Sequence, residues 1–173
     1  VLVVGDISWA MTLADAQADL DRIGTLPGRI VLVRGNHDYW WSGIAKVRAA
    51  IPANMHALQN DCFVADDVVI AGTRAWTIPN EEADESDRKI HLRELARLEL
   101  SLEAARKATR PGMRLVAGLH FPPLLAGGAP TGFTELLERY GVAVCAYGHL
   151  HADAIADAVE GVVRGVSYRL VSC

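Results

Sequence analysis

Residues 30–38 read IVLVRGNHD, and this stretch decides how the whole chain is interpreted. Its first half, Ile30–Val33, is a short apolar run that is typical of a buried strand. Its second half, Gly35-Asn36-His37-Asp38, has the composition of a loop and carries side chains that bind metals. A strand that ends in such a loop is the usual way in which an α/β protein positions functional groups. We therefore take a mixed α/β fold as the working hypothesis.

Strand-like and helix-like segments alternate on both sides of this stretch. Strands are predicted at Val1–Val4, Ile30–Val33, Phe63–Val64, Val68–Ala71, Leu115–Leu119, Val142–Tyr147, Ile155–Val159 and Val166–Val171. Helices are predicted at Leu13–Ile23, Ile44–Ala50, Asp84–Lys107 and Phe133–Tyr140. Thr12 and Asp15 resemble a capping box at the start of the first helix, and Glu160-Gly161 is expected to turn the last hairpin. This order predicts helices packed outside one or two sheets, in a single domain that spans 1–173.

The composition excludes several classes of protein. Of the 173 residues, 51% are apolar, so the chain is not a disordered one, and its apolar runs are far shorter than a membrane span. The net charge is −4 and the arginines are scattered, which argues against nucleic acid as an obligate partner. The cysteines, Cys62, Cys145 and Cys173, stand far apart, which favours a reducing cytoplasm over a disulfide framework. We interpret Cys145, within the apolar stretch 142–147, as a buried and unreactive thiol.

Metal-binding side chains occur in four loops, each of which follows a predicted strand. The loops are Gly5-Asp6, Gly35-Asn36-His37-Asp38, Gly118-Leu119-His120 and Gly148-His149-Leu150-His151. Loops at the carboxyl ends of strands gather at one edge of an α/β sheet, so these side chains are expected to meet. A glycine before each ligand lets the backbone approach an ion closely. Carboxylate, carboxamide and imidazole ligands together suit Mn, Fe, Zn or Ni better than Ca or Mg.

Each of these residues also has a structural interpretation. Asp6 alone could cap a turn, Asn36 could stabilise one, and His120 could be a hydrogen-bonded loop histidine. The order and the strand-end position of all four loops favour metal ligands instead. His149 and His151 support this reading most, because two imidazoles at alternate positions of an extended segment point to the same side.

Other residues have open roles. The tryptophans are equally compatible with a substrate wall and with core packing; they are Trp9, Trp40, Trp41 and Trp76. Arg74 could contact a phosphate, although a surface salt bridge is the more common role of such an arginine. The charged helix at 84–107 could cap the site, and its default interpretation is a solvated helix that covers the sheet.

The four loops together closely resemble the calcineurin-like metallophosphoesterase family, whose ordered signature is DxH…GD…GNHD…H…GHxH. Everything from the GD onward is present between Gly5 and His151, so the resemblance covers most of the chain. The stretches 5–9 and 35–41 look like a bacterial branch of predicted phosphohydrolases. The resemblance implies the four-layer α/β/β/α sandwich of that family, incomplete here at both ends.

The resemblance also assigns roles to individual residues. Asp6 would bridge two metal ions, and the second ion would be bound by Asn36, His120 and His149. The first ion would receive His151. His37 would lie beside the substrate, with Asn36, and protonate the leaving oxygen instead of binding metal. Asp38 would orient His37, as carboxylates often do for imidazoles.

One motif of the signature has no counterpart between Val1 and Cys173. The DxH motif supplies an aspartate and a histidine to the first metal, and it is expected on a strand before Val1, lost by truncation because the chain starts inside an apolar run. Without it the first metal keeps Asp6 and His151, which are too few ligands for a closed site. The expected consequence is that this polypeptide alone is weakly active or inactive.

The function that follows from the resemblance is hydrolysis of a phosphate monoester or small phosphodiester by a hydroxide that bridges two divalent metal ions. A nuclease on the same fold is disfavoured by the acidic balance of the chain. A catalytically silent scaffold for protein binding is disfavoured because His37 and all ligands of the second metal are present. A small phosphate ester is the expected partner, without a membrane or obligate nucleic acid, and the oligomeric state is left open.

Overall fold

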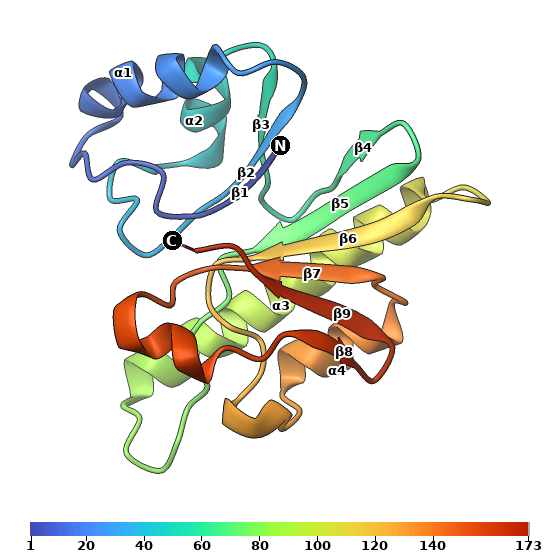
Figure 1. The fold of residues 1–173 in the computed structure, drawn as a ribbon. Coiled ribbons are helices and arrows are strands. Elements are labelled where there is room, and N and C mark those ends of the chain that lie inside the picture. Colours follow the sequence, from blue (N-terminus) through green and yellow to red (C-terminus); the bar gives the residue numbers. More distant parts are fainter. Residues whose placement is uncertain (173) are drawn as a thin grey trace.

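Two β-sheets packed face to face form the centre of the molecule, and helices cover the outer face of each (Figure 1). This architecture is seen in a computed structural model, which describes residues 1–172. Its layers are helix, sheet, sheet and helix, so the predicted four-layer α/β/β/α fold is confirmed. Within residues 1–172 no helix is long and apolar enough to cross a membrane.

The first sheet contains three parallel strands in the order β1-β2-β3. Its elements are β1 (Leu2–Val4), α1 (Leu13–Gly24), β2 (Ile30–Val33), α2 (Ile44–Ala50) and β3 (Met55–Ala57). The helices serve as crossover connections, as parallel neighbours require. Thr12 caps α1, as predicted, by accepting a hydrogen bond from the Asp15 backbone N–H, while the Asp15 carboxylate accepts from the Thr12 hydroxyl and does not complete the predicted capping box. The indoles of Trp40 and Trp41 are buried between these helices and the sheet, so both belong to the core.

The second sheet contains six strands in the order β4-β5-β6-β7-β9-β8. Its strands are β4 (Phe63–Ala65), β5 (Val68–Thr73), β6 (Arg114–Leu119), β7 (Val144–Tyr147), β8 (Gly161–Val163) and β9 (Val166–Leu170). The central four strands are parallel, and β4 and β8 close the two edges as antiparallel hairpins. Short 3-10 helices, η1 (Ala126–Gly128) and η2 (Ala152–Asp157), lie in the connections.

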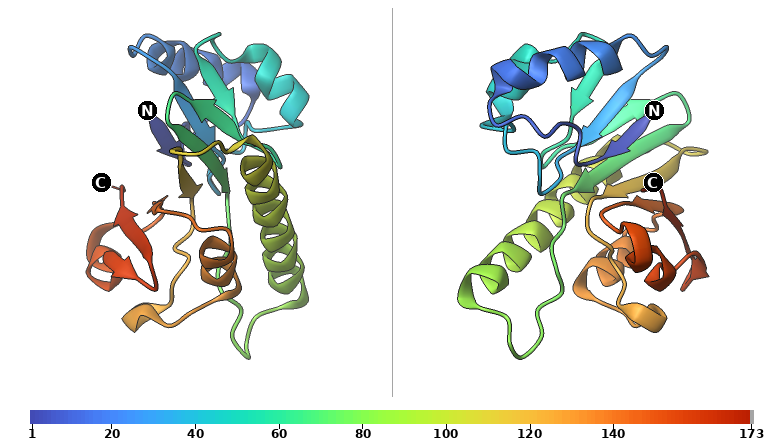
Figure 2. Two further views of the ribbon diagram at one scale, coloured as in Figure 1. Left: turned by 90° about the vertical axis from the view of Figure 1, so that its right-hand side faces the viewer. Right: turned by 60° about the vertical axis from the view of Figure 1, so that its left-hand side comes forward.

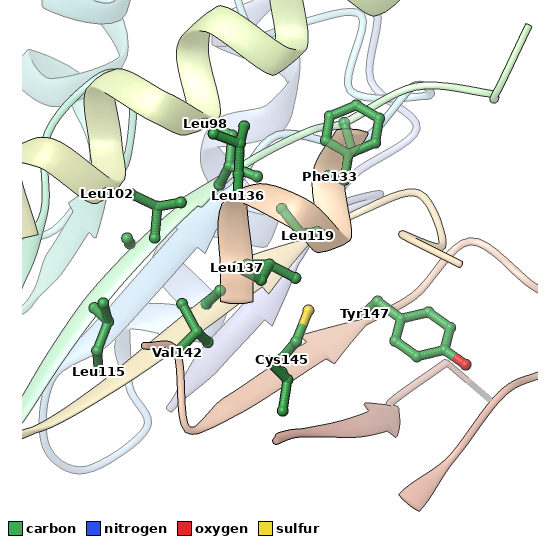
Figure 3. Close-up of a cluster of buried hydrophobic side chains, with 14 of the residues drawn as sticks. Leu98, Leu102, Leu115, Leu119, Phe133, Leu136, Leu137, Val142, Cys145 and Tyr147 are labelled. Atoms are coloured by element: carbon green, nitrogen blue, oxygen red, sulfur yellow. The ribbon is translucent and has the colours of Figure 1, made fainter. Parts of the chain in front are cut away.

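The long helix α3 (Glu85–Ala108) and the short α4 (Gly132–Arg139) cover the outer face of the second sheet. Figure 2 shows α1 and α2 grouped on the first sheet, away from α3. Figure 3 shows Leu98 and Leu102 of α3 and Phe133 of α4 packed towards the sheet. Cys145 lies in this core, where burial raises the pKa of its thiol. It is therefore the buried, unreactive cysteine that its sequence context predicts.

The interface between the two sheets is narrow. Its fully buried side chains are Val31, Val33 and Leu58, with Leu2, Phe63 and Ile70 packed around them. Glycines bring the sheets close together, since a Cβ atom at Gly118 would lie 3.1 Å from the Leu2 side chain and 3.3 Å from Val33. This close approach places the carboxyl ends of β1 and β2 beside those of β6 and β7.

Two local predictions need correction. The sequence analysis assigns no strand at 55–57, where β3 pairs with β2, because three residues carry too little periodicity to be read as a strand. The last hairpin turns at Arg164-Gly165 and not at Glu160-Gly161, and 155–157 belongs to η2. Arg164 and Gly165 both have positive φ angles, 50° and 88°, as a two-residue hairpin turn requires.

Asp61 is expected to make the stability of the first sheet depend on pH. Burial acts to raise the pKa of its carboxyl, but hydrogen bonds from His56 and the Gln59 backbone, with the charge of Arg48, outweigh it and lower that pKa. A pKa that is lower in the folded state gives stability that is present at neutral pH and is lost as pH falls below the unfolded value.

Asp61→Asn should therefore lower the free energy of unfolding by about 1–2 kcal/mol at pH 7, with the deficit shrinking below about pH 4. Urea unfolding between pH 3 and pH 8 measures this. Asp67→Asn, at an exposed turn, is the matched control and should behave as wild type. A deficit of equal size at pH 3 and pH 7 would contradict the assignment to the charged carboxylate.

Candidate metal centre

Four of the five predicted ligands meet where strands of both sheets end. Asp6 follows β1 and Asn36 follows β2, on the first sheet. His120 follows β6 and His149 follows β7, on the second sheet. The centre therefore spans the two sheets, and each sheet supplies two of its side chains.

The donor atoms of these side chains lie within hydrogen-bonding distance of one another. Asn36 Oδ1 is 2.6 Å from His120 Nε2 and 3.0 Å from His149 Nδ1. The two imidazole nitrogens are 3.3 Å apart. Asp6 Oδ1 lies 3.5 Å from His120 Nε2. Donors bound about 2.0–2.2 Å from a common ion have spacings of this order.

The protonation of His120 shows why these atoms suit a cation. Its Nδ1 is 2.8 Å from the carbonyl oxygen of Val4, which only accepts hydrogen bonds, so Nδ1 carries the proton. Nε2 then presents a lone pair to the carbonyl-type oxygen of Asn36, which is also an acceptor. Two facing lone pairs repel each other unless a positive charge lies between them. The donor set therefore fits a divalent transition-metal ion.

Burial keeps both imidazoles in the neutral form that binds metals. It lowers the pKa of His120. The pKa of His149 falls to about 4, through burial first and then through the proximity of His120. Counting His, Cys, Asp and Glu alone, residues 1–172 contain no metal-binding group of three. The convergence depends on the Asn36 carboxamide, which contacts both imidazoles.

Asp38 holds the two ligand loops of the first sheet together. Its fully buried carboxylate accepts hydrogen bonds from the backbone N–H groups of Ile7 (2.8 Å), Ser8 (3.2 Å) and Gly35 (2.7 Å), and from the Trp40 indole (2.9 Å). No hydrogen bond within residues 1–172 joins it to the His37 ring. The hydrogen bonds of Asp38 instead fix the loops that carry Asp6 and Asn36.

A sequence model of the family described as calcineurin-like phosphoesterase matches residues 1–153, most of the chain. The chain belongs to the calcineurin-like phosphoesterase family. Comparison with curated proteins gives no match. Membership in this family indicates phosphoester hydrolysis with the help of divalent metal ions, and the match contains all four ligand loops.

His151, the last ligand expected of a calcineurin-like phosphoesterase here, stands apart from the other four. It is exposed, and its ring makes no hydrogen bond with any residue between 1 and 172. It nevertheless lines the same cavity of about 260 Å³ as Asp6, His120 and His149. The structure therefore brings His151 to the rim of the centre without joining it to the cluster.

The half-buried His37 side chain lies between two exposed aromatic residues, Trp9 and Tyr39. Its ring is stacked on Trp9, with ring centroids 4.4 Å apart and an angle of 24° between the planes. The Tyr39 hydroxyl is 3.4 Å from His37 Nδ1. Trp9 is 72% exposed, whereas Trp40 and Trp41 are buried in the core. Tyr39 gave no signal in the sequence, because its contact with His37 depends on the shape of the loop.

The backbone of the calcineurin-like phosphoesterase centre adopts unusual conformations. Asp6 and His149 have positive φ angles of 53° and 72°, which are costly for residues other than glycine and which cluster at functional sites. Gly5 has φ +96°, and a Cβ atom there would lie 2.5 Å from His120 Nδ1 and 2.6 Å from the Gly35 Cα. The ligand loops therefore interlock at positions where only glycine fits.

Gly5→Ala is expected to destabilise the protein more than the same change at Gly28. Gly28 also has a positive φ, +85°, but a Cβ there would meet nothing within 4 Å, so alanine adds only backbone strain of about 1–2 kcal/mol. At Gly5 the overlap with His120 and Gly35 adds at least about 2 kcal/mol. Urea unfolding of both variants measures the difference. Equal losses would show that the loops do not interlock in this way.

Proposed function

We propose that the natural full-length protein hydrolyses a phosphate monoester or a small phosphodiester, with Asp6, Asn36, His120 and His149 holding one of two divalent metal ions. The observation that carries the proposal is the convergence of Asn36 Oδ1 with His120 Nε2 and His149 Nδ1, at 2.6 and 3.0 Å. With the proton of His120 on Nδ1, the contact between Nε2 and Asn36 Oδ1 joins two acceptors, and a cation between them would satisfy both. Mn, Fe, Zn and Ni all suit such a mixed oxygen and nitrogen ligand set.

The remaining ligand roles follow the same geometry. Asp6 has its side chain beside the cluster and would share a second ion with His151 across the common cavity. Bound metal ions supply charge stabilisation for the phosphoryl oxygens and acidify a water molecule at neutral pH. Because the other ligands are neutral, the loaded centre would be positive and would attract a phosphate ester.

We assign His37 and Asn36 to substrate binding and His37 to proton transfer. The half-buried imidazole of His37 would face a leaving-group oxygen, and Trp9 and Tyr39 hold its ring from two sides. Asp38 acts as a positioning residue, because it holds the loops on which Asp6 and His37 lie. The free thiols of Cys62 and Cys145 are compatible with the cytoplasmic location that we propose; Cys173 lies outside the described residues.

The test measures metal content and hydrolysis of bis-p-nitrophenyl phosphate by the natural full-length protein, with and without added Mn²⁺. We expect about two metal equivalents and metal-dependent turnover. Asn36→Ala and Asp6→Asn should each lose metal and lower activity at least about 100-fold. Asn80→Ala, at an exposed loop, is the control for the asparagine change and should match wild type. A protein that binds no metal, or variants that retain the rate, would favour the silent scaffold instead.

A further inference from the structure

A second cluster of charged side chains lies near the metal centre, between the ends of β2 and β5 and the helix α3. We call it the arginine pocket and define it by Arg34, Arg74, Glu94 and Arg97, which line a common hollow. Arg34 follows β2 and Arg74 follows β5, while Glu94 and Arg97 come from α3. None of these residues belongs to the metal centre described above.

The arginine pocket carries more positive charge than its own residues balance. The Glu94 side chain is 1% exposed, and its Oε1 atom is 2.9 Å from Arg97, 3.4 Å from Arg93 and 3.6 Å from Arg74. Its Oε2 atom accepts a hydrogen bond from the Thr73 hydroxyl at 2.7 Å. One carboxylate thus serves three guanidinium groups, and Arg34 adds a fourth.

Two of these guanidinium groups lack hydrogen-bond partners within residues 1–172. The Arg34 side chain makes no hydrogen bond there, and its buried Nε has no partner. Arg74 is 12% exposed and its Nε is likewise buried without a partner. One face of Arg74 lies 4.4 Å over the Trp76 ring, which offsets part of the desolvation of its charge. Burial lowers the pKa of Arg74 to about 10, so it remains charged at neutral pH.

Buried charges without partners are costly, so this arrangement calls for an anion. A guanidinium group presents five N–H donors in a planar fork that matches the oxygens of phosphate and carboxylate groups. Within the pocket three arginines face one glutamate, and the excess of two positive charges favours a group with a double negative charge over a single carboxylate. The Asp38 carboxylate, whose charge also acts on Arg34, already accepts four hydrogen bonds.

We propose that the arginine pocket binds a small tetrahedral oxyanion of the phosphate class, with Arg34 and Arg74 as its direct ligands. The bound anion would lie close to ligand loops from both sheets. Arg34 directly precedes Gly35 and Asn36, and the Arg74 carbonyl accepts a hydrogen bond from the backbone N–H of Phe121, the neighbour of His120. None of the residues that line the arginine pocket is a candidate metal ligand or catalytic residue. Anion binding at this pocket can therefore be tested separately from hydrolysis.

The test is titration of the metal-stripped full-length protein with inorganic phosphate, by calorimetry and by thermal unfolding at constant ionic strength set with KCl. We expect saturable binding and a rise in melting temperature that chloride does not give. Arg34→Gln should weaken binding by at least about 10-fold, as expected for loss of a charge-assisted hydrogen bond. Arg34→Lys keeps the charge but loses the planar guanidinium group. Its affinity for phosphate should therefore lie between those of wild type and Arg34→Gln.

Two controls distinguish this pocket from other sites. Arg29→Gln makes the same charge change at an exposed position and should bind phosphate as wild type does. Asn36→Ala should also retain binding, because the metal centre is empty of metal in this assay. Adenosine monophosphate in place of phosphate distinguishes a phosphoryl group on a larger molecule from a free anion. Wild-type affinity in both Arg34→Gln and Arg74→Gln, or loss of binding in Asn36→Ala, would overturn the proposal.

Discussion

Replacing His37 with alanine is expected to lower the rate of phosphoester hydrolysis by about 10²–10⁴-fold, the usual size of a general-acid contribution. Metal content should not change, because no hydrogen bond within residues 1–172 joins the His37 ring to Asn36 or His120. The backbone N–H of His37, which donates to Asp6 Oδ1 at 2.9 Å, survives the substitution. Loss of rate without loss of metal would separate proton transfer from metal binding.

Comparing esters with different leaving groups tests whether His37 acts as the proton donor. An alkyl phosphate needs a proton on its departing oxygen, whereas p-nitrophenolate leaves readily without one, so the loss should be much larger for the alkyl ester. We would compare kcat for methyl phosphate and p-nitrophenyl phosphate in wild type and His37→Ala. His91→Ala, on helix α3, is the control for removal of an imidazole. An equal loss for both esters, or loss of metal, would remove His37 from the role of proton donor.

Asp38→Asn is expected to lower the free energy of unfolding by about 3 kcal/mol in metal-free protein. The asparagine has nearly the same shape, but its amide group would place a donor where a carboxylate oxygen now accepts hydrogen bonds. If its remaining oxygen faces Ile7, Ser8 and Trp40, the amide meets the Gly35 N–H, which loses its acceptor. A buried donor without an acceptor is the source of the loss.

The same change should weaken metal binding by about 10–100-fold, because Asp38 holds the loops that carry Asp6 and Asn36. Urea unfolding without metal and titration with Mn²⁺ measure the two effects separately. Asp21→Asn is the matched control, since that exposed carboxylate accepts one hydrogen bond from Gln17. Wild-type stability together with weakened metal binding would show that Asp38 acts on the ion and not on the loops.

The sequence allowed the layers, and the meeting of four candidate ligands at one place, to be predicted because their signals are local. A glycine before a metal-type side chain, at the end of an apolar run, marks a strand end, and parallel strands bring such ends to one edge. The cap at Thr12 is equally local, since it needs only Asp15 three residues later. The pairing of β3 with β2 has no such signal, because Met55–Ala57 is too short to show a period.

The arginine pocket could not be predicted from the sequence, for a different reason. Glu94 lies in a helix whose many charges predict a solvated face, and its complete burial arises from packing of α3 on β5. Arg74 was given two interpretations, phosphate contact and surface salt bridge. It is a largely buried residue near Glu94, over the Trp76 ring. Tertiary packing, and not propensity, decides whether a charged side chain in a helix faces water.

The distribution of ligands over both sheets has a consequence for the lifetime of the protein. Asp6 and Asn36 belong to one sheet and His120 and His149 to the other, and the apolar interface between the sheets is centred on three buried side chains. A shared ion would tie the two halves, with a gain of about 2.7 kcal/mol at a free metal concentration of 100 times its Kd. The population of molecules in which the sheets are transiently separated would fall about 100-fold. Proteolysis, which acts on such open molecules, would slow accordingly. The metal concentration would then determine the lifetime of the protein against proteolysis as well as its catalytic rate.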